Sequence, residues 1–194
     1  MTLKLWLVRH GETEWSLSGA HTSRTDIPLT QCGREQAGAM REYLLSQKFT
    51  RVLTSPMQRA RETCRIAGFA GVAETLQNLC EWDYGQYEGR TTAEIRAAIP
   101  DWSIWDEDPP GGEAIVALGQ RAQGVIEDCL ASGGRIALFS HAHFLRVLAA
   151  VWIGLPPQSG RLLALDTGSV STLAFERETQ VIETWNRSFK PDSE

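Results

Sequence analysis

The sequence predicts an α/β fold: a three-layer α/β/α sandwich with a mainly parallel sheet, in a single domain. Segments with the composition of buried strands alternate with helical segments, which is typical of a parallel sheet covered by helices on both faces. No linker, repeat or low-complexity segment divides the 194 residues, of which 42% are hydrophobic. A chain of this length can bury one sizeable core, so we expect one domain over residues 1–194.

The expected strands are short apolar or alternating runs. Leu3, Leu5 and Leu7, with Trp6 and Val8 among them, indicate a strand that is buried on both faces. RIALFS has the same character, whereas SVSTLAFE and QVIETW alternate and predict a C-terminal hairpin. In chain order the expected strands cover residues 3–8, 51–55, 71–79, 135–140, 169–176 and 180–185.

The expected helices lie between these strands. Thr30 is the expected N-cap of the first, and Pro56 is expected at the first helical position of the second. A polar, Ser/Thr-rich loop follows the first strand at residues 16–28, and an irregular, turn-rich stretch covers residues 100–113. In chain order the expected helices cover residues 31–47, 57–68, 92–99, 114–131 and 143–154.

Composition excludes several classes of function. The net charge of −5 argues against a nucleic-acid partner, because no basic face is indicated. No stretch approaches the roughly 18 apolar residues of a membrane span, and the N-terminus lacks the pattern of a signal peptide. The four cysteines show neither zinc spacing nor a disulfide framework, so we expect a reducing, cytoplasmic setting.

Charged and polar residues stand where three of the expected strands end. The pairs are Arg9-His10, Ser55-Pro56 and Ser140-His141. In open α/β sheets, ligands bind outside the carboxyl ends of the strands. We therefore expect these residues to share one site.

The residue types in this site favour binding of a phosphoryl group. His10 and His141 are each followed by a small residue, Gly11 and Ala142, and glycine lets a backbone approach a ligand closely. His141 would begin a helix, where free N–H groups favour an anion. Arginines such as Arg9 and Arg59 can supply bidentate donors to phosphate. Taken alone, a single histidine after a strand is more often a structural residue than a catalytic one.

Four segments together resemble the histidine phosphatase superfamily, in its phosphoglycerate mutase-like branch. They are LVRHGETEW, SPMQRARET, EWDYGQYEG and SHAHFLR, in the order and approximate spacing of that family. The resemblance implies that His10 attacks phosphorus and becomes a phosphohistidine, which water then hydrolyses. It implies that Arg9, Arg59 and His141 hold the transferring group, and that Glu81 protonates the leaving oxygen.

Further residues are expected to bind the substrate. Thr22 and Ser23 lie in a loop that could also be polar only for solvation, and His143 could instead lie on a helix surface. His21 is expected to be an exposed loop residue, and Trp102 and Trp105 either cover the pocket or anchor a long loop. The candidate substrate-binding residues are Gly11, Thr13, Ser16, Thr22, Ser23, Tyr84, Ala142 and His143.

The resemblance leaves hydrolase and mutase open, and the segment after Gly89 favours the hydrolase. Mutases of the family carry a longer, basic insert there, whereas residues 90–113 are acidic, with Arg90 and Arg96 as the basic residues. Ser16 and His143 are similar to the subgroup that includes sedoheptulose-1,7-bisphosphatase. We therefore expect a phosphatase for a small phosphorylated metabolite, a sugar phosphate or bisphosphate, without a metal or other cofactor. The alternatives are a mutase and a non-catalytic phospho-ligand binding protein; a homodimer stays open.

Overall fold

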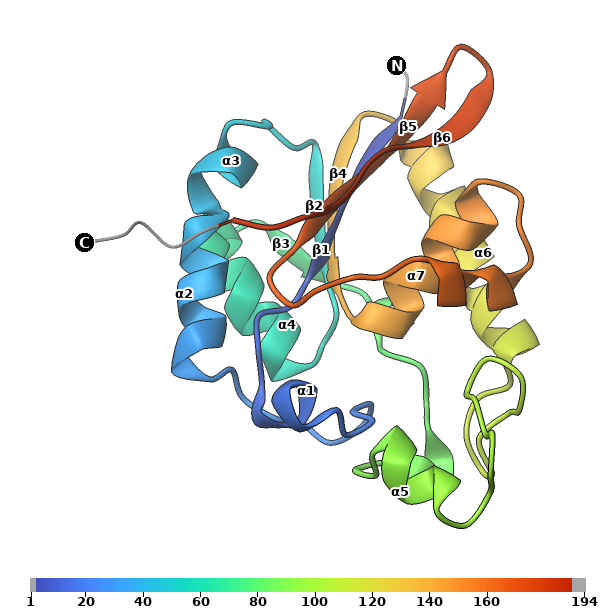
Figure 1. Cartoon of the computed structure of the whole chain (residues 1–194). Helices are drawn as coiled ribbons and strands as arrows, with labels where there is room; N and C mark the ends of the chain where they lie inside the picture. Colours follow the sequence, from blue (N-terminus) through green and yellow to red (C-terminus); the bar gives the residue numbers. More distant parts are fainter. Residues whose placement is uncertain (1–2, 190–194) are drawn as a thin grey trace.

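A computed structural model describes residues 3–189, which form one six-stranded sheet with helices on both faces (Figure 1). The strand order is β3-β2-β4-β1-β5-β6. Strands β1 to β4 are parallel, and β5 runs antiparallel to β1 and β6 to β5. The predicted α/β fold with a mainly parallel sheet is confirmed, and the C-terminal hairpin extends this sheet beside β1.

The elements follow one another as the sequence alternation predicts. The strands are β1 (Lys4–Arg9), β2 (Arg51–Thr54), β3 (Ala73–Thr75), β4 (Arg135–Ser140), β5 (Val170–Glu176) and β6 (Thr179–Arg187). The helices are α1 (Glu14–Ser18), α2 (Gln31–Ala39), α3 (Arg41–Leu45), α4 (Gln58–Cys64), α5 (Thr92–Arg96), α6 (Ile115–Ser132) and α7 (Ala142–Trp152). Short 3-10 segments cover Gln77–Leu79, Gly85–Tyr87 and Pro157–Leu162, and a π-helical turn covers Arg65–Phe69.

The alternating side chains of the central strands build two hydrophobic cores. On β1, Leu5 and Leu7 pack in the core that includes α6 and α7, whereas Trp6 and Val8 pack with Met40, α3 and α4. All four side chains are buried. Since successive residues of a strand point to opposite faces, both faces of β1 are covered. This double burial explains why the first strand is apolar on both faces.

The carboxyl ends of β2, β4 and β1 lie side by side at one edge of the sheet (Figure 1). The backbone N–H of His10 donates to the carbonyl of Ser140 (3.1 Å), and that of Ser55 donates to Phe139 (2.9 Å). Both hydrogen bonds continue the parallel ladder one residue past the strands. The predicted convergence of the three strand ends is confirmed.

The first predicted helix, residues 31–47, is two helices instead. Thr30 caps α2 as predicted, with its Oγ1 accepting from the N–H of Gly33 at 3.0 Å. Met40 separates α2 from α3 with φ −84° and ψ −8°, a bridge conformation that interrupts the helical hydrogen bonds. The fully buried side chain of Met40 packs with Trp6 and Val8, so packing against the sheet fixes this break.

The start of α4 also differs from its prediction. Pro56 does not lie at the first helical position: Met57 is the extended N-cap, and α4 begins at Gln58. The carboxylate of Asp26, from the preceding loop, accepts the N–H of Gln58 at 2.7 Å. The start of α4 is therefore set by a cap from the distant residue Asp26 and not by the proline.

Three other elements are shorter or additional. The predicted strand over residues 71–79 pairs with β2 only at Ala73–Thr75 and continues as a 3-10 segment. The predicted helix over residues 92–99 ends at Arg96. The short helix α1 was not predicted; it begins within the polar segment after β1 and ends inside the expected loop. Within residues 3–189, no helix is both long enough and apolar enough to cross a bilayer.

Candidate active site

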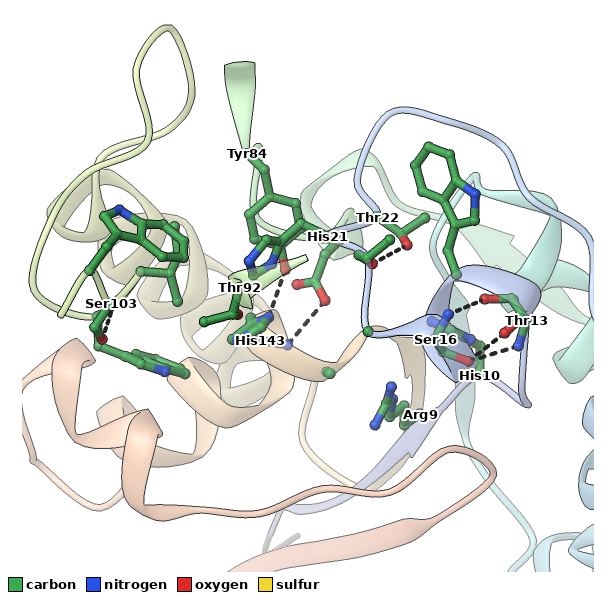
Figure 2. A pocket seen from close by; sticks show the side chains of 18 of the residues that line it. Arg9, His10, Thr13, Ser16, His21, Thr22, Tyr84, Thr92, Ser103 and His143 are labelled. Carbon is green, nitrogen blue, oxygen red and sulfur yellow. Dashed lines mark hydrogen bonds between the residues drawn. The ribbon is translucent and has the colours of Figure 1, made fainter. Parts of the chain in front are cut away.

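A cavity of about 360 Å³ opens at the carboxyl ends of β1 and β4 (Figure 2). Its walls come from β1, α1, the loop that follows α1, the segments around residues 81–84 and 92–105, and the start of α7. Nine predicted site residues line it: Arg9, His10, Thr13, Ser16, Thr22, Glu81, Tyr84, Ala142 and His143. Four predicted residues do not line this cavity: Gly11, Ser23, Arg59 and His141.

His10 follows β1 directly and is 6% exposed. Its Nδ1 lies 2.7 Å from its neighbour's carbonyl oxygen, that of Gly11. A carbonyl only accepts hydrogen bonds, so Nδ1 carries the ring proton and Nε2 keeps a lone pair. Burial, together with the charges of Arg59 and Arg9, holds the pKa of His10 well below 6.5. The ring is therefore neutral near pH 7, with Nε2 as its unprotonated nitrogen.

His141 is the N-cap of α7 and is fully buried behind the cavity. Its Nδ1 accepts from Nε of Arg59 at 3.2 Å, which leaves the ring proton on Nε2 to donate to Ser55 Oγ at 2.8 Å. The rings of His141 and His10 are 5.2 Å apart between centroids. Burial, followed by the charge of Arg59, lowers the pKa of His141 well below 6.5. Both histidines are therefore neutral.

Arg59 is also fully buried, although it belongs to the short helix α4. Besides its bond to His141, it donates to the carbonyls of Thr25 (3.1 Å) and Ser23 (3.1 Å). The loop that carries these carbonyls is held in turn by Glu88, whose carboxylate accepts the N–H groups of Ser23 and Thr25 at 2.9 Å each. Glu88 thus has a structural role, because it holds this loop in place.

Arg9 is the cation that reaches the cavity wall. Its Nη1 donates to the carbonyl of Leu165, whereas its Nε is buried without a hydrogen-bond partner in the structure. Burial lowers the pKa of the guanidinium, and the charge of Glu81 opposes this effect. An unpartnered buried donor costs free energy unless an acceptor fills the space, and an anion would do so.

The N-terminus of α7 already binds a side chain, the carboxyl group of Glu81. Glu81 Oε1 accepts from the backbone N–H of Phe144 (2.8 Å) and of Trp82 (2.9 Å), and Oε2 accepts from that of His143 (3.0 Å). The N–H groups of His143 and Phe144 are free because the first N–H groups of a helix have no partner within it. The N–H groups of His143 and Phe144 bind Glu81 in this structure, and binding of a phosphate at the start of α7 stays a prediction.

Gly11 owes its identity to the fold. A Cβ at Gly11 would lie 2.2 Å from the carbonyl oxygen of Gly33, so the segment after β1 crosses α2 at van der Waals contact. The N–H of Gly11 donates to Thr63 Oγ1 at 3.1 Å and faces the protein. The expectation that Gly11 admits a ligand is wrong for this structure.

Thr13 and Ser16 line the cavity and also cap α1. Thr13 Oγ1 accepts the N–H of Ser16 (3.1 Å), and Ser16 Oγ accepts the N–H of Thr13 (2.8 Å), which is a reciprocal capping box. Thr22 Oγ1 donates to the carbonyl of Ala20 at 2.9 Å. All three hydroxyl groups are thus engaged within the protein.

The sequence model of the histidine phosphatase superfamily (branch 1) matches residues 5–188. The chain belongs to this superfamily. The superfamily resemblance drawn from the four segments is thereby confirmed.

Named relatives are similar over most of the chain. An acid phosphatase of Mycobacterium tuberculosis is 38% identical, covering 89% of this chain and 87% of its own. The sedoheptulose 1,7-bisphosphatase of Saccharomyces cerevisiae is 34% identical, covering 81% and 70%. The solved structure of the open reading frame Rv3214 from M. tuberculosis has a TM-score of 0.92 at 35% identity, covering 97% and 99%.

Mutase relatives occur beside these phosphatases. A protein of Yersinia enterocolitica described as probable phosphoglycerate mutase GpmB is 30% identical, covering 94% of this chain and 90% of its own. Membership of the superfamily thus includes both kinds of enzyme, and the chain's own residues must decide between them.

Several lining residues of this phosphatase-family pocket were not predicted. His21 is 8% exposed and lines the cavity, so the expectation of an exposed loop residue is wrong. Its ring lies 4.7 Å from that of Tyr84 and 5.6 Å from that of Trp102, between centroids. Trp102 and Trp105 are buried and line the cavity, so they anchor their loop and also form a wall. No local pattern indicated that these distant segments meet.

His143 and Tyr84 are paired across the cavity wall (Figure 2). Tyr84 Oη and His143 Nδ1 are 2.6 Å apart. Burial, followed by the charge of Arg146, lowers the pKa of His143 well below 6.5, and burial raises the pKa of Tyr84 well above 10. Both side chains are therefore neutral near pH 7, and His143 lies inside the pocket instead of on a helix surface.

Within residues 3–189, no group of three or more His, Cys, Asp or Glu side chains is arranged to hold a metal ion. Cys32, Cys64, Cys80 and Cys129 are free thiols. Burial raises the pKa of Cys64 and of Cys129 to about 12, so these two thiols are unreactive at neutral pH.

Proposed function

We propose that this protein is a metal-independent phosphomonoesterase that hydrolyses a small phosphorylated metabolite, a sugar phosphate or bisphosphate, through a phosphohistidine on His10. The observation that carries the proposal is the state of His10: a neutral imidazole with an unprotonated Nε2, in a pocket beside the unpartnered Nε of Arg9. A neutral nitrogen nucleophile next to an unfilled cationic donor suits attack on a phosphoryl group. The phosphatase relatives support the reaction class.

The first step transfers the phosphoryl group to the protein. The lone pair of His10 Nε2 forms a bond to phosphorus while the bond from phosphorus to the ester oxygen breaks. Arg9 balances the charge of the transferring group, since such transfers are accelerated mainly by positioning and charge. Arg59 and His141 do not line the cavity. They would contact the phosphoryl group directly only after giving up their hydrogen bonds to the carbonyls of Ser23 and Thr25 and to the Ser55 hydroxyl group.

Glu81 supplies the proton for the leaving oxygen. Its Oε1 accepts two backbone N–H groups and its Oε2 accepts one, so Oε2 has a lone pair to spare. Oε2 is therefore the atom that would pass a proton to the leaving oxygen. The three backbone donors fix the carboxyl group in place at the cavity wall.

The second step regenerates the protein. Water attacks the phosphorus, the bond between phosphorus and Nε2 breaks, and the electron pair returns to the imidazole. Glu81 takes a proton from the attacking water, and inorganic phosphate leaves. The chain returns to its initial state with no net change in protonation.

The alternative is a mutase, and the relatives described as probable phosphoglycerate mutases favour it. A mutase shares the first step but passes the phosphoryl group to a second hydroxyl instead of water. It must hold a carboxylate-bearing substrate, and Arg96 is the one cation of the cavity lining besides Arg9. The scarcity of cations supports hydrolysis.

Phosphate release in EDTA tests the proposal. We expect release from phenyl phosphate and from sugar phosphates, and a loss of at least about 10³-fold in His10→Ala, with folding checked by circular dichroism. Hydrolysis that persists in a folded His10→Ala protein would overturn the role of His10. Conversion of 3-phosphoglycerate to its isomer without release would identify a mutase, and binding of phosphate esters without turnover would identify a binding protein.

The cytoplasmic location and the absence of nucleic-acid and membrane partners stay predictions, as does assembly as a homodimer. Cell fractionation tests the location, and sedimentation analysis tests the assembly.

A further inference from the structure

The part of the cavity away from His10 is walled by rings. We call it the outer chamber, formed by His21, Tyr84, Trp102, Trp105 and His143. Between ring centroids, Trp105 lies 5.1 Å from His143 and His21 lies 6.2 Å from His143. Figure 2 shows Tyr84, His21 and His143 between Ser103 on one side and His10 on the other. A group attached to a phosphate at His10 would therefore enter this chamber.

Two polar atoms of the outer chamber, His21 Nε2 and Trp102 Nε1, have no partner in the structure. His21 Nε2 is buried and makes no hydrogen bond. The backbone of His21 is held on both sides: its N–H donates to the carbonyl of Arg90 (2.9 Å), and its own carbonyl accepts from Gly89 (2.8 Å). A buried polar atom without a hydrogen-bond partner costs free energy. The unpaired Nε2 of this fixed imidazole therefore indicates that a ligand supplies the missing hydrogen bond.

A further polar atom comes from His143. Its Nδ1 is the acceptor that the buried Tyr84 hydroxyl needs, so Nε2 carries the ring proton. His143 can therefore donate from Nε2 while remaining neutral. The chamber thus combines flat apolar faces with uncharged hydrogen-bonding groups.

Formal charge is scarce in the cavity lining. Among its residues, Arg9 and Glu81 lie at the phosphate end, and Arg96 is the remaining charged one. Arg96 is exposed, and its Nε donates to the backbone carbonyl of Trp102 at 2.8 Å. A second phosphate or a carboxylate in the outer chamber would be desolvated against rings, with Arg96 as the exposed cation of the lining and Arg146 over the Trp105 ring.

We propose that the outer chamber selects a leaving group without a second anion: a neutral, hydroxyl-bearing ring of the sugar type, packed against Trp105 and hydrogen-bonded by His21 and His143. This inference rests on the proposed phosphatase activity and narrows its substrate class to phosphate monoesters of neutral polyhydroxy alcohols. Rings supply apolar contact area and a few fixed polar atoms supply orientation, which is how small-molecule sites achieve specificity.

The test compares two monoesters on three proteins. Glucose 1-phosphate carries hydroxyl groups into the chamber, whereas phenyl phosphate carries a ring without them. We expect His21→Phe, which keeps a ring but removes the polar atoms, to lower kcat/KM for glucose 1-phosphate at least about tenfold and for phenyl phosphate less than about threefold. We expect His21→Gln, whose Nε2 can take the place of the imidazole Nε2, to recover most of the loss.

The wild-type protein gives an independent readout, which needs no variant to fold. We expect kcat/KM for glucose 1-phosphate to exceed that for glucose 1,6-bisphosphate and for 3-phosphoglycerate. A preference for either doubly anionic substrate would overturn the proposal, and so would equal losses of His21→Phe on both monoesters. Failure of the wild-type protein to hydrolyse even phenyl phosphate would instead overturn the proposed function, so the two failures are distinguishable.

Discussion

At the scale of single residues, the hydrogen bonds of Glu81 make its proposed role testable through the leaving group. A glutamine at this position keeps the shape but cannot supply a proton, so a poor leaving group suffers and a good one does not. We expect Glu81→Gln to lower kcat for an alkyl phosphate by about 10²–10⁴-fold and for p-nitrophenyl phosphate by much less. Steady-state kinetics on the two substrates measures this, and equal losses would remove Glu81 from the role of acid.

The sequence predicted those site residues whose positions follow from local patterns. Arg9 and His10 end a buried strand, and the acidic residue Glu81 belongs to a recognisable segment, so their presence at one sheet edge was predictable. The burial of His21 was not, because the rings that cover it come from positions 84 and 102. Such contacts depend on tertiary packing, which no local pattern encodes.

At the scale of elements, the contact between the segment after β1 and α2 requires glycine on both sides. A Cβ at Gly33 would lie 2.2 Å from the carbonyl oxygen of Glu12, whereas a Cβ at Gly38, in the same helix, meets nothing within 4 Å. We expect Gly33→Ala to lower the free energy of unfolding by at least about 2 kcal/mol, because overpacking forces the backbone to shift. We expect Gly38→Ala to raise it by about 0.5–1 kcal/mol through helix propensity.

Urea unfolding of the two variants beside the wild-type protein measures this pair. Gly38→Ala is the matched control, since it makes the same substitution in the same helix without the contact. Equal effects in the two variants would show that α2 can move away from Glu12, and the close approach would then not be a structural requirement.

Element boundaries were predicted less well than element types. The buried strands were recognised because burial on both faces leaves a continuous apolar run. The helix break at Met40 and the start of α4 at Gln58 were missed, since the first depends on packing under the sheet and the second on a cap from Asp26. The five-residue helix α1 is too short for any periodic signal, although the Thr13–Ser16 capping box marks its start.

At the scale of the whole molecule, topology explains why a site could be expected at all. The strand order places β4 between β2 and β1, so three chain segments far apart in the sequence end together. A parallel sheet guarantees that such ends share one edge, which made the phosphate end of the cavity predictable. The outer chamber depends on the irregular segment 100–113, for which no such rule exists.

The same architecture buries His10, His21 and His141 and half-buries His143, and this makes the stability of the fold depend on pH. Burial is the largest cause that lowers the pKa of His10, His21, His141 and His143 below 6.5. Below about pH 6.5 the unfolded chain binds protons on these side chains and the folded chain does not, so lowering the pH favours unfolding. Above that pH all four are neutral in both states, and their contribution is constant.

We therefore expect the free energy of unfolding to be nearly constant from pH 8 to 7 and to fall between pH 6.5 and 5.5. Each histidine contributes a loss of up to about 1.4 kcal/mol per pH unit. Unfolded carboxyl groups titrate near pH 4, below this window. Urea unfolding at several pH values measures how steeply the free energy of unfolding falls with pH. We expect His21→Gln to reduce this slope by the contribution of one histidine, up to about 1.4 kcal/mol per pH unit. If the free energy of unfolding stays level or rises from pH 6.5 to 5.5, the folded protein protonates its histidines. That result would contradict the neutral state of His10, on which the proposed attack depends.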